Sequence, residues 1–267
     1  MSTIATLFTI PFSHYCEKAR WGLDICGIQY QEVKRLPLFH LPTVSWVLRN
    51  NTHATSDKTS SRNSTPVLKC PDGALISDST DILKYSETQN GTSLHLDDDT
   101  TMSVVERLGN VLGPHTRRLA YHHVLADKAA TRIMAKKNVG AFQSTLFSLT
   151  RPLAASALKK VLNVTPQSAA RSLQIINEEL DWIESMLGKE FLCGDEFSAA
   201  DLTFAALATP ILLITRQEGF GGHLPSINDM QSPYSDMAIE FRGRPAGQHA
   251  LNMYQRYRTA NAFQSPT

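Results

Sequence analysis

This sequence of 267 residues has few cysteines, a net charge close to zero and no long apolar run. Each of these features excludes some classes of protein. The four cysteines are not spaced as metal ligands are, so we expect reduced thiols and no metal. A formal net charge of +1 implies neither a basic surface for nucleic acid nor a patch for a membrane surface.

The apolar segments are too short for a chain that crosses a membrane. The longest run, residues 204–214, is about half the length that spans a bilayer, and it contains Pro210. The first residues lack the basic segment of a signal peptide and suit a strand instead, so we expect a cytoplasmic protein. The sequence also contains no internal repeat, G-x-G-x-x-G, P-loop or G-x-S-x-G motif.

Hydrophobic residues make up 42% of the chain, which is enough to form the core of one large domain or two medium ones. The most informative stretch is residues 10–27, IPFSHYCEKARWGLDICG. It follows a β-prone segment, and apolar residues then recur at helical spacing from Cys16 to Cys26, before Gly27. A strand that turns into a helix is therefore predicted here.

Ser13 lies at the predicted N-cap of this helix, where a serine can also donate a hydrogen bond. The free N–H groups and the partial positive charge of the helix N-terminus favour a thiolate or another anion nearby. Cys16 is one turn away on the same side. A serine before a helix is more often a cap with only a structural role, and the S-x-x-C pattern alone does not separate the two interpretations.

The residues that follow predict a small mixed sheet. Residues 28–33 suit a strand parallel to the first, which completes a βαβ unit. Prolines in residues 37–42 leave room for at most a short helix from Thr43. The polar residues 49–64 predict a mobile surface loop, either a lid or a tolerated insertion.

Two further strands are predicted at residues 65–70 and 74–77, joined as an antiparallel hairpin by the turn Pro71-Asp72-Gly73. Several N-cap candidates in residues 77–81 then precede a helix. The resulting order is β-α-β-(α)-β-β-α.

Beyond a linker at residues 89–100, strand signals largely disappear and an all-α domain is predicted. Its helices are expected from residue 102 to Gly113-Pro114, over residues 115–137, over 141–162 with a break near Pro152, over 166–187, over 202–215 and over 247–260. Ser198 and Asp201 predict a capping box for the very apolar helix that starts near residue 202, which should lie at the centre of the domain.

With these parts in place, the chain resembles a cytosolic glutathione transferase. Four motifs carry the resemblance, namely residues 11–20, 64–68, 77–82 and 197–204. The resemblance implies an α/β thioredoxin-like N-terminal domain followed by an all-α helical domain. The corresponding boundaries are 1–88 for the first domain, 89–100 for the linker and 101–267 for the second.

The resemblance also implies a site for glutathione as cosubstrate. A cis bond before Pro66 would expose the backbone of Val67 to the cysteinyl part of the tripeptide. Ser79 and the N–H groups beside it would hold the γ-glutamyl carboxylate, with Asp78 near the amino group. The glutathione-binding residues expected in this way are Thr65, Pro66, Val67, Asp78 and Ser79.

Ser13 takes the position at which serine-type members, such as the theta, zeta and bacterial-type classes, stabilise the glutathione thiolate. The thiolate would attack a small hydrophobic electrophile or a peroxide. The helical domain would supply the electrophile pocket, near Arg117, Tyr121 and His122. A homodimer is expected from the family.

Two other functions stay open. Cys16 is a second catalytic candidate, for a thiol transferase that exchanges disulfides with glutathione, although thiol-exchanging members place cysteine where this chain has Ser13. The fold could instead carry apolar ligands or partners without turnover. The polar loop replaces the region that usually binds the glycine carboxylate of glutathione, and His40, Lys58 and Arg62 are candidates for that role.

Overall fold

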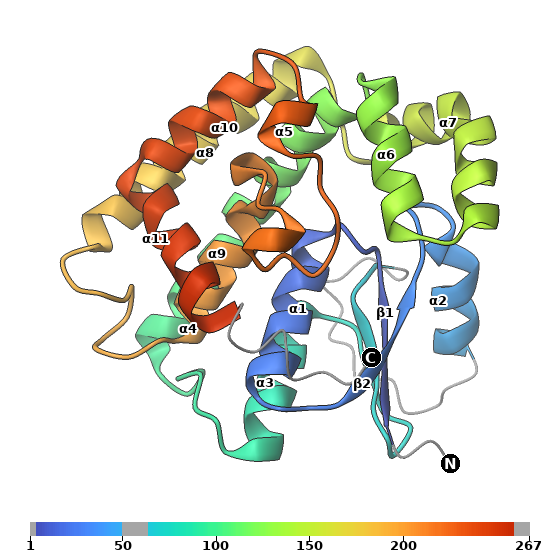
Figure 1. The fold of residues 1–267 in the computed structure, drawn as a ribbon. Coiled ribbons are helices and arrows are strands. Elements are labelled where there is room, and N and C mark those ends of the chain that lie inside the picture. Colours follow the sequence, from blue (N-terminus) through green and yellow to red (C-terminus); the bar gives the residue numbers. More distant parts are fainter. Residues whose placement is uncertain (1–3, 50–63, 259–267) are drawn as a thin grey trace.

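The computed structural model describes residues 4–49 and 64–258. Its first part contains a four-stranded sheet with the order β2-β1-β3-β4, seen edge-on beside α1 in Figure 1. β1 is parallel to β2 and antiparallel to β3, and β3 and β4 form the expected hairpin. The strands are β1 (Ala5–Thr9), β2 (Tyr30–Lys34), β3 (Val67–Lys69) and β4 (Leu75–Ile76).

Helices cover both faces of this sheet. Leu7 packs with side chains of α1 (His14–Ile25) and α3 (Ser79–Asn90), whereas the adjacent Phe8 packs with α2 (His40–Arg49). Successive side chains of a strand point to opposite faces, so β1 anchors both layers. The predicted thioredoxin-like arrangement is confirmed.

The second part is entirely helical among the described residues, as predicted. Its α-helices are α4 (Asp99–Arg107), α5 (Gly113–Val124), α6 (Lys128–Asn138), α7 (Ala141–Val161), α8 (Pro166–Met186), α9 (Ala199–Leu212), α10 (Tyr234–Gly243) and α11 (Pro245–Met253). Two π-helical turns, Leu108–Leu112 and Tyr254–Arg258, and two 3-10 turns, Arg216–Glu218 and Ile227–Asp229, complete it.

Every residue of α9 is buried, and the other helices surround it. The predicted capping box is present: Asp201 accepts hydrogen bonds from the backbone N–H and the hydroxyl of Ser198, at 3.1 and 2.9 Å. Asp201 also accepts a hydrogen bond from the N–H of Leu192 at 2.9 Å. The box therefore ties the start of the central helix to the segment that precedes it.

Three helix limits predicted from proline and glycine are wrong. α2 begins at His40 rather than Thr43, because Pro42 occupies its first turn, where no N–H is needed. Pro152 does not interrupt α7, whose inner face is held by buried packing. The helix before Gly113 does not end there but continues through the π-helical turn into α5.

Conversely, the predicted helix over residues 115–137 is interrupted. α5 ends at Val124, and the carboxylate of Asp127 caps α6 by accepting from the N–H groups of Ala129 and Ala130 at 2.8 and 2.9 Å. The chain therefore reverses after α5, and α6 and α7 stand next to α2 in the upper right of Figure 1. The polar loop predicted at 49–64 lies almost wholly outside the described residues.

Candidate active site

A cavity of about 390 Å³ lies where the N-terminus of α1 meets the helical half. Most of its walls are apolar, and side chains of α1, α2, α5, α6 and α7 contribute to them. The cavity brings together five of the residues singled out in the sequence, namely Ser13, His40, Thr65, Arg117 and Tyr121.

Ser13 is the N-cap of α1, as predicted. Its Oγ accepts a hydrogen bond from the N–H of Cys16 at 3.5 Å, and its own N–H donates to the carbonyl of Ile10 at 2.9 Å. The Oγ accepts from the helix, and its single hydrogen can rotate to donate either to the Cys16 sulfur or into the cavity. A sulfur atom placed there would meet both this donor and the positive end of the helix.

Cys16 is in a different environment. Its side chain is fully buried, and it is not part of the cavity wall. Burial raises the pKa of its thiol, against the opposing effects of the Arg20 charge and of hydrogen bonds from Ser13 and Thr65. The thiolate form of Cys16 is therefore disfavoured.

The segment expected to hold glutathione has the anticipated backbone form. The Thr65–Pro66 peptide bond is cis, and Val67 opens β3 opposite Phe8. Asp78 caps α3 by accepting from the N–H groups of Thr80 and Asp81 at 2.7 and 3.3 Å. These two N–H groups are thus occupied, which leaves Ser79 as the group at this helix start that a carboxylate could bind.

A buried lysine next to this helix start is not predicted by the sequence. Lys18 is 1% exposed, and its Nζ donates to the hydroxyl of Thr80 at 2.7 Å. Burial lowers its pKa to about 8, against the attraction of Asp78 and Asp81. Lys18 lies among apolar positions of α1, and only the folded structure reveals its partner.

His14 and Tyr15 also line the cavity and were missed by the sequence analysis. His14 Nε2 is 2.9 Å from the carbonyl oxygen of Gly113, and the hydroxyl of Tyr15 donates to the carbonyl of Gly109 at 2.8 Å. A Cβ atom at Gly113 would lie 2.3 Å from the Tyr15 hydroxyl oxygen. Glycine is therefore required at this position for close packing, and it does not mark the end of a helix.

Three titratable groups of this wall, His14, Tyr15 and Tyr121, are held in their neutral forms. Burial, together with the charge of Arg117, lowers the pKa of His14 to about 3. Burial raises the pKa of Tyr15 and of Tyr121 to about 12. Arg117, 5.8 Å from the centre of the Tyr15 ring, is the charged side chain of the cavity wall within the described residues.

His122 is not brought together with Ser13. It lines a separate hollow of about 510 Å³ with His123, Lys128, Lys159 and other residues. His123 stacks on the ring of Tyr234 with the ring centres 4.7 Å apart. His122 and Tyr121 are adjacent in α5, and successive helical residues point about 100° apart, so only one of them reaches the cavity.

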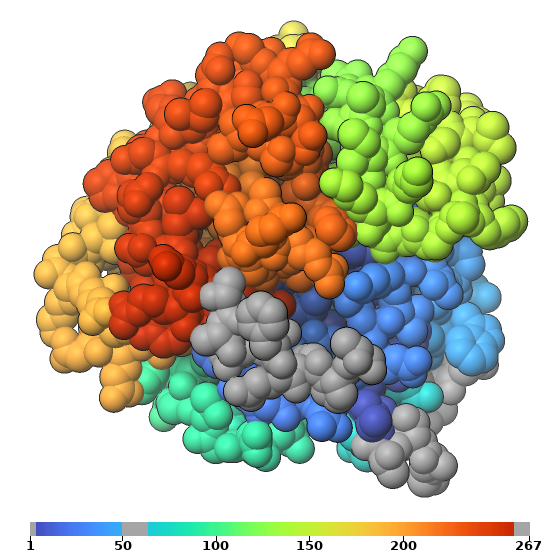
Figure 2. Space-filling model, viewed as in Figure 1, coloured from blue at the N-terminus to red at the C-terminus, as the bar shows by residue number. Residues whose placement is uncertain are grey.

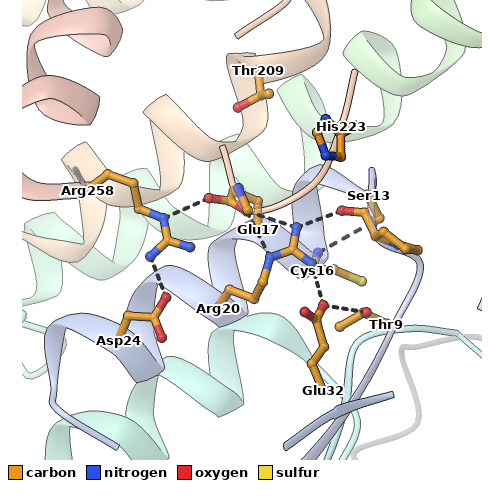
Figure 3. A network of polar contacts seen from close by, with 12 residues as sticks. Thr9, Ser13, Cys16, Glu17, Arg20, Asp24, Glu32, Thr209, His223 and Arg258 are labelled. Carbon is orange, nitrogen blue, oxygen red and sulfur yellow. Dashed lines mark hydrogen bonds and ion pairs between the residues drawn. The ribbon is translucent and has the colours of Figure 1, made fainter. Parts of the chain in front are cut away.

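A buried network of ion pairs supports the turn that carries Ser13 (Figure 3). The guanidinium of Arg20 donates to the carbonyl of Pro11 at 2.8 Å, to Glu17 at 2.9 Å and to Glu32 at 2.8 Å. These contacts join the active-site turn, α1 and β2 around one cation. The turn is therefore held from behind by groups that are buried or mostly buried.

The same network reaches into the helical half. Glu17 accepts from Nε of Arg258 at 2.8 Å and from the N–H of Gly221 at 3.0 Å, and Arg258 also pairs with Asp24. A Cβ atom at Gly222 would lie 2.3 Å from the carbonyl oxygen of Pro11. The loop before α10 thus packs directly against the active-site turn, and the last helical turn is joined to α1.

No cluster of three or more metal-ligating side chains occurs in residues 4–49 or 64–258. None of the helices described is both long and apolar enough to cross a bilayer.

Comparison with known families agrees with this geometry. The family model for the N-terminal domain of glutathione S-transferases matches residues 12–89, and the model for their C-terminal domain matches residues 166–224. This chain belongs to the glutathione S-transferase family. The family matches contain the active-site turn, the cis-proline segment, the start of α3 and the capping box of α9. No curated protein matches the sequence of this member of the family.

Solved glutathione S-transferases share its fold at low sequence identity. One from Phanerochaete chrysosporium is 16% identical, with a TM-score of 0.60 over 96% of this chain and 99% of that chain. One from Ceriporiopsis subvermispora, in complex with glutathione, is 19% identical, with a TM-score of 0.58 over 95% and 97%. A theta-class member from Xanthomonas axonopodis, with glutathione bound, is 14% identical, with a TM-score of 0.51 over 94% and 98%.

Proposed function

We propose that this glutathione S-transferase binds glutathione, stabilises its thiolate at Ser13 and directs it at a small hydrophobic electrophile or a peroxide. The observation that carries this proposal is the place of Ser13: its hydroxyl lies at the N-terminus of α1 on the wall of a largely apolar cavity. A donor and a helix N-terminus at one point favour thiolate over thiol.

Glutathione binding is proposed for the segment beside Ser13. The backbone of Val67 pairs with the cysteinyl part of the tripeptide, with Thr65 at the cavity wall and Pro66 between them. Ser79 binds the γ-glutamyl carboxylate, and the charge of Asp78 attracts the amino group. Two N–H groups of α3 already donate to Asp78, so the hydroxyl and N–H of Ser79 are the groups that bind the carboxylate.

In the proposed transfer, the thiol of glutathione loses its proton to solvent, and the thiolate accepts a hydrogen bond from Ser13. The sulfur then forms a bond to the electrophilic carbon, and the leaving group departs with its bonding electrons. With a peroxide, the sulfur forms a bond to one peroxide oxygen, the O–O bond breaks and the alkoxide leaves and takes up a proton. The thiol of a second glutathione then attacks the sulfur of the resulting sulfenic acid, which gives glutathione disulfide and water. Ser13 does not ionise in either reaction.

The cavity suits an electrophile that is mainly apolar with one polar end. Phe147, Met134 and Leu158 line it, while the neutral hydroxyl of Tyr121 and the charge of Arg117 supply polar contacts. These two groups are placed to stabilise negative charge on a leaving group. A homodimer and a cytoplasmic location accompany the proposal as expectations from the family.

The two alternatives are less well supported. The burial of Cys16 and its raised pKa argue against a thiol transferase that uses this residue. A carrier without turnover would need the same cavity but no glutathione site. Affinity for glutathione separates this last function from the proposed one.

Calorimetric titration of reduced glutathione into the full chain tests the proposal. We expect measurable binding that weakens about tenfold or more in Ser79→Ala, because a hydrogen bond to a charged group is lost. Ser185→Ala, at an exposed serine of α8, is the matched control and should bind as the unchanged chain does. Absence of glutathione binding to the unchanged chain would overturn the proposal in favour of a carrier.

A further inference from the structure

The outward face of α7 carries large apolar side chains that are exposed and not packed into the core. Phe142, Leu149 and Leu153 are 84%, 75% and 76% exposed, and Leu146 between them is 36% exposed. The spacings of four, three and four residues place all four on one side of the helix. We call this set, Phe142, Leu146, Leu149 and Leu153, the outer stripe.

The outer stripe is separate from the face that holds α7 in place. Phe147, Ala154 and Leu158 are buried on the inner face, and Arg151 turns inward to donate to the carbonyl of Leu125 at 2.8 Å. α7 is therefore apolar on two sides, and the inner side accounts for its packing. A row of exposed large apolar groups on one helix marks an interaction surface.

The charge around the outer stripe is strongly one-sided. Residues 128–161, which form α6 and α7, contain seven lysines and arginines and no aspartate or glutamate. The whole chain carries a formal net charge of +1, so the remainder is net negative. The overall charge, from which no membrane-surface patch was expected, conceals this local excess.

The hairpin that carries the stripe also carries exposed basic side chains, of which Lys128 and Lys159 border the hollow lined by His122. Lys160 follows Leu153 by seven residues and so continues the line of the stripe toward the end of α7. The exposed cations of the two helices are Lys128, Arg132, Lys136, Lys137, Lys159 and Lys160. In Figures 1 and 2 the α6–α7 hairpin, coloured green to yellow-green, forms the upper right edge of the molecule.

We propose that the α6–α7 hairpin docks on an anionic lipid bilayer. The outer stripe enters the boundary between headgroups and acyl chains, and the lysines and arginines lie at the level of the lipid phosphates. A helix with a row of Phe and Leu next to basic residues has the composition of a peripheral, non-spanning membrane contact. Lys160 can extend its ammonium to the headgroups while its stem stays against the apolar layer.

A second copy of this chain fits the same surface less well. Two-fold pairing through the outer stripe would bring two identical hairpins together, each with seven cations and no acidic residue. Their repulsion opposes such a dimer, whereas an anionic surface attracts both cations and stripe. The proposal does not depend on catalysis by this protein.

Sedimentation with lipid vesicles tests the proposal on the purified full chain. We expect binding to phosphatidylcholine vesicles that contain about one third phosphatidylserine, and little binding to pure phosphatidylcholine. Leu149→Ser combined with Leu153→Ser should reduce the binding about tenfold or more, because the apolar contact is lost. Lys159→Gln combined with Lys160→Gln should weaken it as well and reduce its dependence on salt.

Ile239→Ser is the matched control, since Ile239 is 58% exposed on α10, outside the hairpin. It should leave vesicle binding unchanged. The proposal is overturned if the unchanged chain does not sediment with anionic vesicles, or if the stripe variant binds them equally well. Conversion of a dimer to a monomer by the stripe variant, without vesicle binding, would identify the stripe as an interface between copies.

Discussion

At the scale of single residues, Ser13 and Cys16 are one helical turn apart and have opposite environments. The Ser13 hydroxyl borders the cavity, whereas the Cys16 thiol is buried with a raised pKa. We therefore expect Ser13→Ala to lower kcat/KM for conjugation to an aryl halide about 100-fold at neutral pH, since loss of a donor to a developing anion has this order of effect. Steady-state kinetics with glutathione as the fixed substrate measure it.

Cys16→Ser supplies the comparison for that variant, because it changes a single atom in the buried position. It should keep most of the conjugation activity. If Cys16→Ser abolished activity and Ser13→Ala did not, the roles assigned to the two residues would be reversed.

The sequence was sufficient to predict Ser13 as an N-cap and a site residue, but it did not predict that the neighbouring His14 and Tyr15 line the cavity. An N-cap is defined by the residues beside it, so its pattern is local. Tyr15 and His14 contact residues 94 and 99 positions away, at Gly109 and Gly113, and no local pattern encodes such pairs. Arg117 and Tyr121 reach the cavity and His122 does not, because the rotation of α5 is set by its packing on other helices.

At the scale of secondary-structure elements, the chain contains one capping motif in two environments. The box of α9 is buried, and Asp201 satisfies three donors of the chain there. The box of Ser226 and Asp229 has the same contacts at the surface, with Ser226 N–H donating at 2.9 Å. Asp201 also accepts from Leu192 and lies 3.0 Å from Nε2 of His249, so the two boxes differ in burial and in these additional partners.

We expect Asp201→Ala to lower the free energy of unfolding by about 2–4 kcal/mol, because it leaves buried N–H groups without partners. Asp229→Ala should cost about 1 kcal/mol, the usual value for an exposed cap. Urea unfolding followed by circular dichroism measures both. Equal losses in the two variants would contradict the central role of the α9 box.

At this scale the sequence predicted that most of the helices exist, but it did not predict where several of them begin and end. Gly113, Pro42 and Pro152 are local breakers, yet the helices that contain them continue. At Gly113 the reason is visible, since only a residue without a side chain admits the Tyr15 ring. Local propensity is a weak prior, and tertiary packing overrides it at these positions.

At the scale of the whole molecule, Arg258 joins the last helical turn to α1. Its Nε pairs with Glu17, and the side chains are 4% and 0% exposed. Arg258→Met should lower the free energy of unfolding by about 3–5 kcal/mol, because it removes one partner of a buried ion pair. Thermal unfolding measures the change.

Arg256→Met is the matched control for Arg258→Met, two residues earlier in the same helical turn. Arg256 pairs with Glu190 at the surface, with side chains 49% and 58% exposed. Its loss should cost less than about 1 kcal/mol. A loss of stability in this control as large as in Arg258→Met would show that burial of the Glu17 pair is not the cause.

Stability should also depend on pH in a defined direction. Burial tends to raise the pKa of Glu17, but Arg258 and Arg20 outweigh it and hold the pKa below its ordinary value of 4.5. The folded state therefore binds fewer protons than the unfolded state, so this stabilisation is present above pH 4.5 and is lost as the pH falls through the lower folded pKa. His14, with its pKa lowered to about 3 from 6.5, acts in the same direction between these values.

We thus expect the free energy of unfolding to fall progressively below about pH 6.5 and more steeply below about pH 4.5. Denaturant unfolding at a series of pH values measures this profile. A stability that is constant from neutral pH to about pH 4 would contradict the lowered pKa of His14, and a profile that does not steepen below about pH 4.5 would contradict that of Glu17.

The most direct test of the central claim is the pKa of the glutathione thiol in the complex, followed by the ultraviolet absorbance of the thiolate as the pH is varied. The account predicts a value well below the ordinary thiol pKa of about 8.5 in the unchanged chain, and a return toward it in Ser13→Ala. A bound thiol that titrates at the same pH in both proteins would show that Ser13 does not stabilise the thiolate.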